Sequence, residues 1–136
     1  MLAKPMILSV KVVIRDREGR CLLLKRAQNS RGNPGKWEFP GGKVAVGEEF
    51  EQVVQREVSE ETSLTVCLQR GLGTAQAELP TRRVLYLILE ADLVAGQVQL
   101  SSEHDEYAWR YPHELPEMDL VRHFAQFARH YARGEM

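Results

Sequence analysis

The segment between residues 48 and 64 carries the strongest structural signal in the chain. Phe50, Val53, Val54 and Val58 recur at three- and four-residue spacing, and neither glycine nor proline interrupts this segment. This pattern predicts an amphipathic helix whose apolar stripe packs against a core. The rest of the chain must therefore supply a surface that can receive this helix.

Carboxylates share the helix with the apolar stripe. At about 100° per residue, Glu57 and Glu61 project within roughly 35° of the centre of the stripe near Phe50, and Glu60 flanks it. Burial of an unpaired carboxylate is costly, so such a group is neutralised or paired with a cation. A solvated acidic face is the alternative interpretation. The side of the helix expected to face solvent is formed by other residues: Glu51, Gln52, Gln55 and Ser59.

A divalent cation is the partner that these carboxylates favour. Oxygen ligands at i, i+3 and i+4 on one helix can converge on one or two ions, and Mg²⁺ or Mn²⁺ is commonly shared with a phosphate. Immediately upstream, Pro40, Gly41 and Gly42 offer backbone groups that a ligand can approach without interference from a Cβ atom. Together these features indicate phosphate chemistry with Mg²⁺ as the expected cofactor and Mn²⁺ as its substitute.

One long spaced pattern is formed by Gly42, Glu48, Arg56, Glu57, Val58, Glu60, Glu61 and Leu64. This pattern resembles the signature box of the Nudix hydrolases. One position departs from the family pattern, because Ser63 stands where a glycine usually follows the helix and adopts a positive φ. The departure concerns the helix exit and leaves every acidic position intact. The segment Trp37 to Gly42 also resembles the lead-in that often precedes the box.

The resemblance implies both a fold and a reaction. The fold is α/β of the α+β kind, a Nudix-type α/β/α sandwich with a central mixed β-sheet. The reaction is hydrolysis of a nucleoside diphosphate linked to another group. Glu57, Glu60 and Glu61 would hold Mg²⁺, aided by the backbone carbonyl of Gly41 and by Glu103 in a later acidic loop.

Supporting roles follow for the remaining polar residues of the site. Arg56 and Glu48 are expected to orient the acids through charge-assisted hydrogen bonds. For the loop ligand, Glu106 is the alternative to Glu103, and a solvated acidic loop is the simpler explanation of both. The general base, Glu57 or a loop acid, stays open because family members differ in this respect.

The implied substrate class is that of MutT-like enzymes, which cleave nucleoside triphosphates, oxidised guanine nucleotides included, to a monophosphate and pyrophosphate. Arg26 matches a substrate-binding position of that group, and Lys43 follows the double glycine. Asp119 lies near the place where the group reads a purine edge, there usually with Asn. A nucleotide-sugar substrate such as ADP-ribose is the alternative, since Pro80 lies sixteen residues beyond Leu64. An inactive nucleotide-binding regulator is a further alternative, which the intact acids oppose.

Apolar runs elsewhere predict a sheet. Residues 7–14 and 21–24 flank a polar turn and predict a hairpin of core strands. An amphipathic helix is expected from Asp119 onward, capped by Asp119 itself. Strands around a central and a terminal helix suggest a mixed sheet between helices. Further strands are expected at residues 37–39, 64–68, 73–79 and 84–89.

Composition narrows the remaining classes. The 136 residues, 43% hydrophobic, fit a single domain spanning residues 1–136. A formal net charge of −1 shows no excess of positive charge, so we expect no stable nucleic-acid partner. Cys21 and Cys67 lack a disulfide framework or a zinc spacing with the histidines and are expected to be buried free thiols. The N-terminal apolar run is too short and polar for a signal peptide or membrane span, so we expect a cytoplasmic protein. Its expected partner is a small nucleotide, and monomer and homodimer both stay open.

Overall fold

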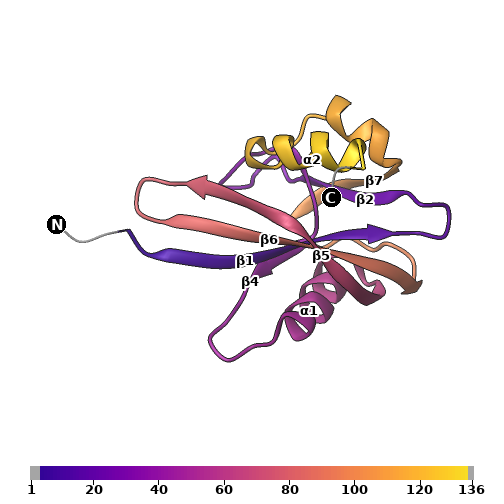
Figure 1. Ribbon diagram of the computed structural model, residues 1–136, viewed down its shortest axis with the longest axis horizontal. Helices are drawn as coiled ribbons and strands as arrows, with labels where there is room; N and C mark the ends of the chain where they lie inside the picture. The colour runs from indigo at the N-terminus through magenta and orange to yellow at the C-terminus, as the bar shows by residue number, and fades with distance from the viewer. Residues whose placement is uncertain (1–3, 135–136) are drawn as a thin grey trace.

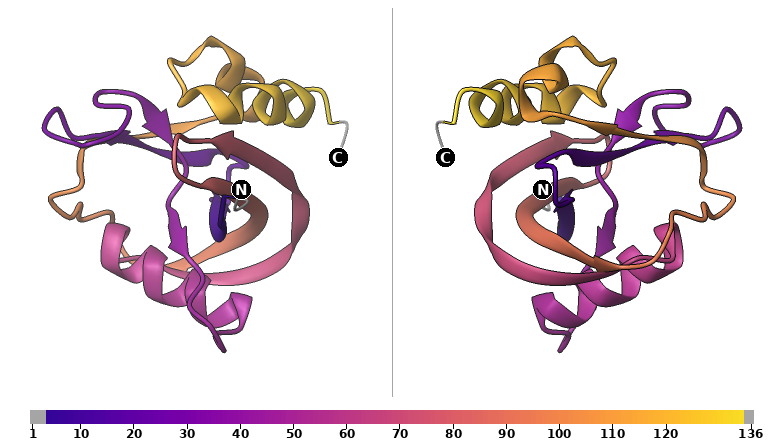
Figure 2. Two further views of the ribbon diagram at one scale, coloured as in Figure 1. Left: turned by 90° about the vertical axis from the view of Figure 1, so that its left-hand side faces the viewer. Right: turned by 90° about the vertical axis from the view of Figure 1, so that its right-hand side faces the viewer.

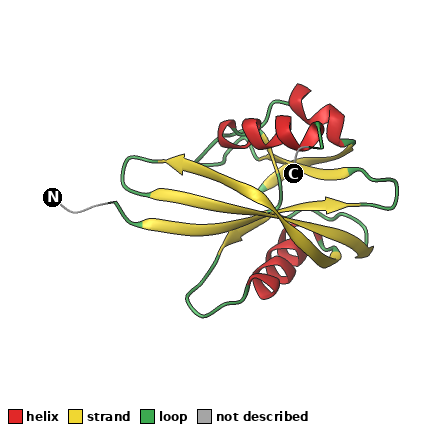
Figure 3. Ribbon diagram, in the orientation of Figure 1, coloured by secondary structure: helices red, strands yellow, loops and turns green. Residues whose placement is uncertain are grey.

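The computed structural model describes residues 4–134, which form a β-sheet between two helical layers (Figures 1 and 3). Helix α1 (Phe50–Thr62) covers one face, and α2 (Ala125–Ala132) lies over the other with the 3₁₀ helices η1 (Pro112–Glu117) and η2 (Arg122–Phe124). This arrangement confirms the expected α/β/α sandwich. The strands are β1 (Met6–Arg15), β2 (Cys21–Arg26), β3 (Trp37–Glu38), β4 (Gly41–Lys43), β5 (Thr65–Glu78), β6 (Arg83–Ala95) and β7 (His104–Arg110).

The sheet is mixed, as predicted. Its strand order is β3-β2-β1-β6-β5, with β4 also paired to β1 and β7 to β2. β1 and β6 run parallel along the whole of β1, whereas the other strand pairs are antiparallel. β5 and β6 form a long, strongly curved pair that bends around one side of the molecule (Figure 2).

β1 changes its antiparallel neighbour along its length. It pairs with β4 around Lys11 and with β2 at Arg15. The chain crosses from β3, which pairs with β2, to β4 through residues 39–40, and the Pro40 carbonyl accepts a hydrogen bond from Val12 N at 2.8 Å. Two groups of strands therefore diverge beside Lys11, and the candidate site lies at this divergence.

Alternation along β1 fills two cores. Val10 and Val12 pack in the cluster that receives α1, whereas Val13 belongs to the cluster under α2. Lys11 shares the α2 side, where its Nζ lies 5.8 Å from the ring centroid of Phe124. A charged residue consequently interrupts an otherwise apolar strand at the edge of the α2 core.

The apolar stripe of α1 packs as expected except at its first residue. Val53, Val54 and Val58 are fully buried, but Phe50 in the first turn is 42% exposed, so the expectation that Phe50 marks the centre of the buried stripe was wrong. At the other end, Ser63 adopts the left-handed conformation (φ 64°, ψ 13°) and its N–H bonds to the Ser59 carbonyl. Ser63 therefore produces the helix exit that glycine usually provides.

Two strand boundaries differ from expectation. The segments at 64–68 and 73–79 belong to one strand, β5, because register shifts against β6 absorb the interval between them. These shifts occur between Leu68 and Arg70 and between Gly71 and Gly73. Each of these bulges leaves one residue of β5 unpaired, Gln69 or Leu72, and bends the strand.

Asp119 does not cap the terminal helix. Its carbonyl accepts a hydrogen bond from Trp37 N at 2.9 Å, and Val121 N donates to the Trp37 carbonyl at 2.8 Å. These bonds hold residues 119–121 extended against β3, so α2 starts only at Ala125 after η2. The Asp119 carboxylate instead pairs with Lys36 Nζ at 2.7 Å.

The two cysteines have opposite surroundings. Cys21 is fully buried, and burial raises the pKa of its thiol to about 12. Cys67 is exposed, contrary to expectation, because its neighbour Val66 takes the inward position of β5.

None of the helices within residues 4–134 is long and apolar enough to cross a membrane.

Candidate active site

Helix α1 turns two of its glutamates toward the sheet and leaves a third at the flank. Glu61 is only 5% exposed and Glu57 is partly buried, whereas Glu60 is exposed. Helical periodicity explains this placement, because Glu61 lies on the face that also carries Val54 and Val58. The acids therefore occupy positions that a packing helix would normally fill with apolar side chains.

The double glycine gives these acids room. Gly41 has a φ of +154°, and a Cβ atom there would lie 2.0 Å from the Val10 carbonyl oxygen. A Cβ on Gly42 would lie 2.4 Å from the carboxyl carbon of Glu57. The Gly41 N–H also donates to Glu61 Oε2 at 3.2 Å. Gly41 thus allows β4 to lie close against β1, and Gly42 leaves the space that the Glu57 carboxylate occupies.

Arg56 connects two acids at the mouth of the site. Its Nη1 donates to Glu57 Oε1 at 2.6 Å, and its Nη2 donates to Glu48 Oε1 at 3.0 Å. A third bond runs from Arg56 Nε to Glu48 Oε2 at 3.2 Å, so Glu48 is held by both oxygens. The structure therefore brings Arg56 and Glu48 into the orienting contacts expected of them.

The environments shift the carboxyl groups in opposite directions. Burial raises the pKa of Glu61 to about 8, against the opposing influence of Lys11 and the Gly41 N–H. Burial also raises the pKa of Glu57, although Arg56 counteracts it. Hydrogen bonds from Arg56, joined by Ala45 N–H, lower the pKa of Glu48. At both inward acids, Glu57 and Glu61, the effect of burial on the pKa therefore outweighs that of the nearby positive charges.

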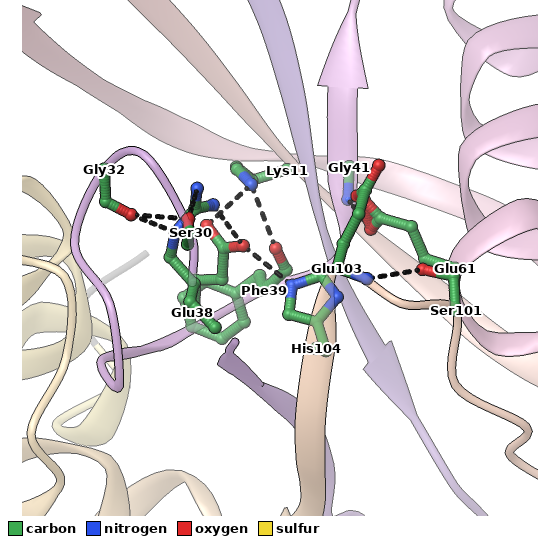
Figure 4. Close-up of polar contacts among 11 residues, drawn as sticks. Lys11, Ser30, Gly32, Glu38, Phe39, Gly41, Glu61, Ser101, Glu103 and His104 are labelled. Atoms are coloured by element: carbon green, nitrogen blue, oxygen red, sulfur yellow. Dashed lines mark hydrogen bonds and ion pairs between the residues drawn. The ribbon is translucent and has the colours of Figure 1, made fainter. Parts of the chain in front are cut away.

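Glu103 reaches this site from the loop before β7. Its carboxylate, the Glu61 carboxylate and a ring nitrogen of His104 lie within 4.8 Å of one another. Figure 4 shows the Glu103 and Glu61 side chains converging beside Gly41, with the His104 ring next to them. Of the two loop acids considered from the sequence, Glu103 is in this group, whereas Glu106 pairs with Lys25 at 3.2 Å.

A buried charge network adjoins the acids, and sequence reasoning did not identify it. The Glu38 carboxylate is bonded by Lys11 Nζ at 3.1 Å, Arg26 Nη1 at 2.9 Å and His104 Nε2 at 2.9 Å. Burial alone would raise the pKa of Glu38, but Lys11, His104 and Arg26 outweigh it and hold the pKa well below its usual range. The signal was available, because a lysine within an apolar strand and a glutamate between two aromatics each require a buried partner.

The three proposed substrate-binding residues lie in different surroundings. The Arg26 guanidinium is engaged by Glu38, by the Gly32 carbonyl at 2.7 Å and by Ser30 Oγ at 2.7 Å, so it ties down the loop after β2. Lys43 is exposed at the end of β4. Asp119 is paired with Lys36 as described above. Substrate contact by these residues remains a prediction.

The donor set fits a divalent cation. Glu61 and Glu103 offer carboxylate oxygens within 4.8 Å of each other. Glu57 lies outside that group, with Oε1 bonded to Arg56, and Glu60 is exposed at the flank. The raised pKa of the buried Glu61 shows that its charged form lacks compensation, which a bound cation would supply. Hard oxygen donors of this kind are those that Mg²⁺ and Mn²⁺ prefer.

Comparison with known proteins gives a consistent result. A family model described as NUDIX domain matches residues 5–131. A MutT-like protein of Streptomyces ambofaciens is 35% identical over 106 residues, which are 78% of this chain and 64% of that relative. Nucleoside triphosphatase NudI of Escherichia coli is 29% identical over 114 residues, covering 76% of this chain and 81% of NudI.

Solved structures agree with the family match. The MutT protein of Methanosarcina mazei Go1 superposes with a TM-score of 0.89 at 38% identity, covering 98% of each chain. The ORF135 protein of Escherichia coli gives a TM-score of 0.80 at 28% identity over 93% of this chain and 88% of that one. The likeness thus extends over nearly all of the chain.

Proposed function

The chain belongs to the NUDIX domain family of hydrolases acting on pyrophosphate bonds, and from this premise we propose that it is a Mg²⁺-dependent nucleoside triphosphate pyrophosphohydrolase. The proposed products are a nucleoside monophosphate and pyrophosphate. The observation that carries the proposal is the buried Glu61 carboxyl, which lies against the double glycine and close to Glu103. A carboxylate in such a place is stabilised when a cation joins it to an anionic substrate.

The metal-binding role falls to the acids of α1 and its surroundings. We assign Glu57, Glu60 and Glu61 as ligands, together with Glu103 and the backbone carbonyl of Gly41. A bound cation neutralises charge on the diphosphate and favours attack of water on phosphorus. Gly42 keeps the Glu57 carboxylate in place by leaving it space, since a Cβ there would overlap it.

Proton transfer is assigned to an acid that the protein already orients. Glu57 is the candidate base because Arg56 fixes one of its oxygens and burial raises its pKa toward the working range of a base. Glu103 is the alternative, since its carboxylate lies close to that of Glu61. Glu48 acts on neither substrate nor proton and keeps Arg56 in position.

The substrate proposal draws on the relatives and on three side chains. Two of the relatives are named as a MutT-like protein and a nucleoside triphosphatase. Lys43, exposed beside the double glycine, is the proposed phosphate contact, and Arg26 adds positive charge near Glu38. Asp119 is the proposed base-reading group. It can accept hydrogen bonds from the amino and imino groups of a guanine base, so oxidised guanine nucleotides belong in the first panel.

A nucleotide panel tests this proposal. Nucleoside triphosphates, oxidised dGTP and ADP-ribose are each incubated with the protein and Mg²⁺, and pyrophosphate, phosphate and monophosphates are quantified. We expect pyrophosphate and monophosphate in equal amounts from a triphosphate, with activity abolished by EDTA and restored by Mg²⁺. Release of phosphate alone, or hydrolysis of ADP-ribose only, would refute the triphosphate assignment. A preference for oxidised guanine is the hypothesis attached to Asp119, and equal kcat/KM for oxidised and ordinary dGTP would refute it.

A further inference from the structure

His104 is a buried histidine with one unused ring nitrogen. Its side chain is 1% exposed, and its Nε2 lies 2.9 Å from Glu38 Oε2. The other ring nitrogen, Nδ1, is buried and has no hydrogen-bond partner among the described residues. A buried polar atom without a partner is costly, so this nitrogen calls for an explanation.

The partners of Glu38 determine the state of the histidine ring. Glu38 also accepts from Lys11 Nζ and Arg26 Nη1, two cations that keep its carboxylate ionised. An ionised carboxylate only accepts, so Nε2 of His104 must carry the hydrogen. In the neutral imidazole, Nδ1 then presents a bare lone pair. Glu38 therefore selects the tautomer in which the lone pair of Nδ1 is available to a metal ion or a hydrogen-bond donor.

The surroundings of the ring favour a cation over any protein group. A ring nitrogen of His104 lies within 4.8 Å of carboxylate oxygens of Glu61 and Glu103. Figure 4 shows the ring between Glu38 on one side and this pair of acids on the other. A carboxylate that accepts one N–H of an imidazole, while the other nitrogen is left for a metal, is the arrangement that orients metal-binding histidines in general.

We propose that His104 is a metal ligand of this enzyme, binding the divalent cation through Nδ1 beside Glu61 and Glu103. The inference rests on the proposed metal-dependent hydrolysis and specifies the ion. Imidazole nitrogen strengthens the binding of first-row transition ions, whereas Mg²⁺ gains little because it prefers oxygen. His104 therefore adds affinity for ions such as Mn²⁺ and Co²⁺, whereas Mg²⁺ is held by the oxygen ligands. Glu38 is the residue that positions the histidine.

The test measures the bound ion directly. Mn²⁺ binding to the intact chain is titrated by the loss of the free-ion electron paramagnetic resonance signal, and electron spin-echo modulation of the bound ion reports a directly coordinated ¹⁴N nucleus. We expect ¹⁴N modulation in the wild-type protein and its loss in His104→Gln. The glutamine amide can still donate to Glu38 where Nε2 stands, but it has no equivalent of Nδ1. Mn²⁺ affinity should fall on the order of 10-fold or more, while Mg²⁺ affinity, measured by competition, changes far less.

The matched control is His113→Gln, which alters an exposed histidine stacked on Tyr111. This variant should retain both the ¹⁴N modulation and the wild-type affinity, and circular dichroism should show that both variants are folded. Mn²⁺ bound with wild-type affinity but without ¹⁴N modulation would overturn the role of His104 and leave the proposed function standing. Failure of the wild-type protein to bind Mn²⁺ or Mg²⁺ at all would overturn both.

Discussion

Helix α1 differs from an ordinary packing helix in that one of its buried residues is a glutamate, Glu61. Glu61 shares its face with fully buried valines, and its closest compensation from the protein is one backbone N–H and the more distant charge of Lys11. The pKa of about 8 means that the metal-free protein holds a proton on Glu61 at neutral pH. The proton and a metal ion thus compete for the same carboxylate.

This competition predicts how the stability of the metal-free protein depends on pH. The folded-state pKa of Glu61 lies above its ordinary value of 4.5, so the folded state binds more protons than the unfolded state between these values. The free energy of unfolding must therefore fall as pH rises from about 5 to about 8, by at most about 1.4 kcal/mol per pH unit from this group. Thermal unfolding in EDTA between pH 5.5 and 8.5 measures the slope.

Glu61→Gln provides the comparison for that measurement. The amide does not ionise, so the variant should show a flatter dependence of the unfolding temperature on pH than the wild-type protein. Saturating Mg²⁺ should raise the unfolding temperature of the wild-type protein most at the alkaline end. Superimposable pH profiles for wild type and variant would mean that Glu61 is already ionised without metal.

At the scale of elements, close approach of β4 to α1 shapes the site. Gly42 has no positive-φ requirement, and its importance lies in the space that the Glu57 carboxylate occupies. We predict that Gly42→Ala leaves the fold intact, because the end of a flexible side chain can move, but lowers kcat on the order of 10-fold or more by displacing Glu57. Steady-state kinetics together with thermal unfolding distinguish the two effects.

Gly71→Ala is the matched control for this substitution. Its added Cβ would meet nothing closer than a Leu89 methyl group at 4.0 Å. The control should keep wild-type kcat. Wild-type kcat in Gly42→Ala as well would show that the position of the Glu57 carboxylate is unimportant for turnover.

The exit of α1 offers a test of backbone strain. Ser63 holds a left-handed conformation that costs a non-glycine residue roughly 1 kcal/mol. Ser63→Gly should therefore raise the free energy of unfolding by about 0.5–1 kcal/mol, after allowance for the extra freedom of glycine in the unfolded chain. Chemical denaturation measures this change. The same substitution at Ser59, within the helix, should instead lower stability by about 0.5 kcal/mol, and a loss of stability in both variants would contradict the account of Ser63.

At the scale of the whole molecule, much of the architecture follows from local sequence. The stripe of α1 and the alternating runs of β1 and β2 predict their elements, because each buries one face against a neighbour. The start of α2 could not be predicted in this way, since bonds between residues 119–121 and Trp37 override the capping tendency of Asp119. The exposure of Cys67 likewise depends on the register of β5 against β6.

The candidate site also combines contacts that follow from local sequence with contacts that depend on strand pairing. Glu57 and Glu61 lie one turn apart on α1, so helical spacing predicts that both project toward the sheet. Glu48 precedes the helix, and its contact with Arg56 depends on the loop before α1. The group of Lys11, Glu38 and His104 comes from three strands, and only the pairing of the sheet brings it together. Its members carry a local signal, an ionisable residue in an apolar setting, but the identity of their partners is a property of the fold.

If the acids of α1 hold a divalent cation for hydrolysis, Glu57→Gln must lose turnover at saturating Mg²⁺. The amide removes both a metal ligand and the candidate base, so kcat should fall on the order of 10² or more. The control is Glu51→Gln on the exposed face of the same helix, which should keep wild-type kcat. Near-full activity of Glu57→Gln, at matched Mg²⁺ and with an unchanged circular dichroism spectrum, would contradict the account.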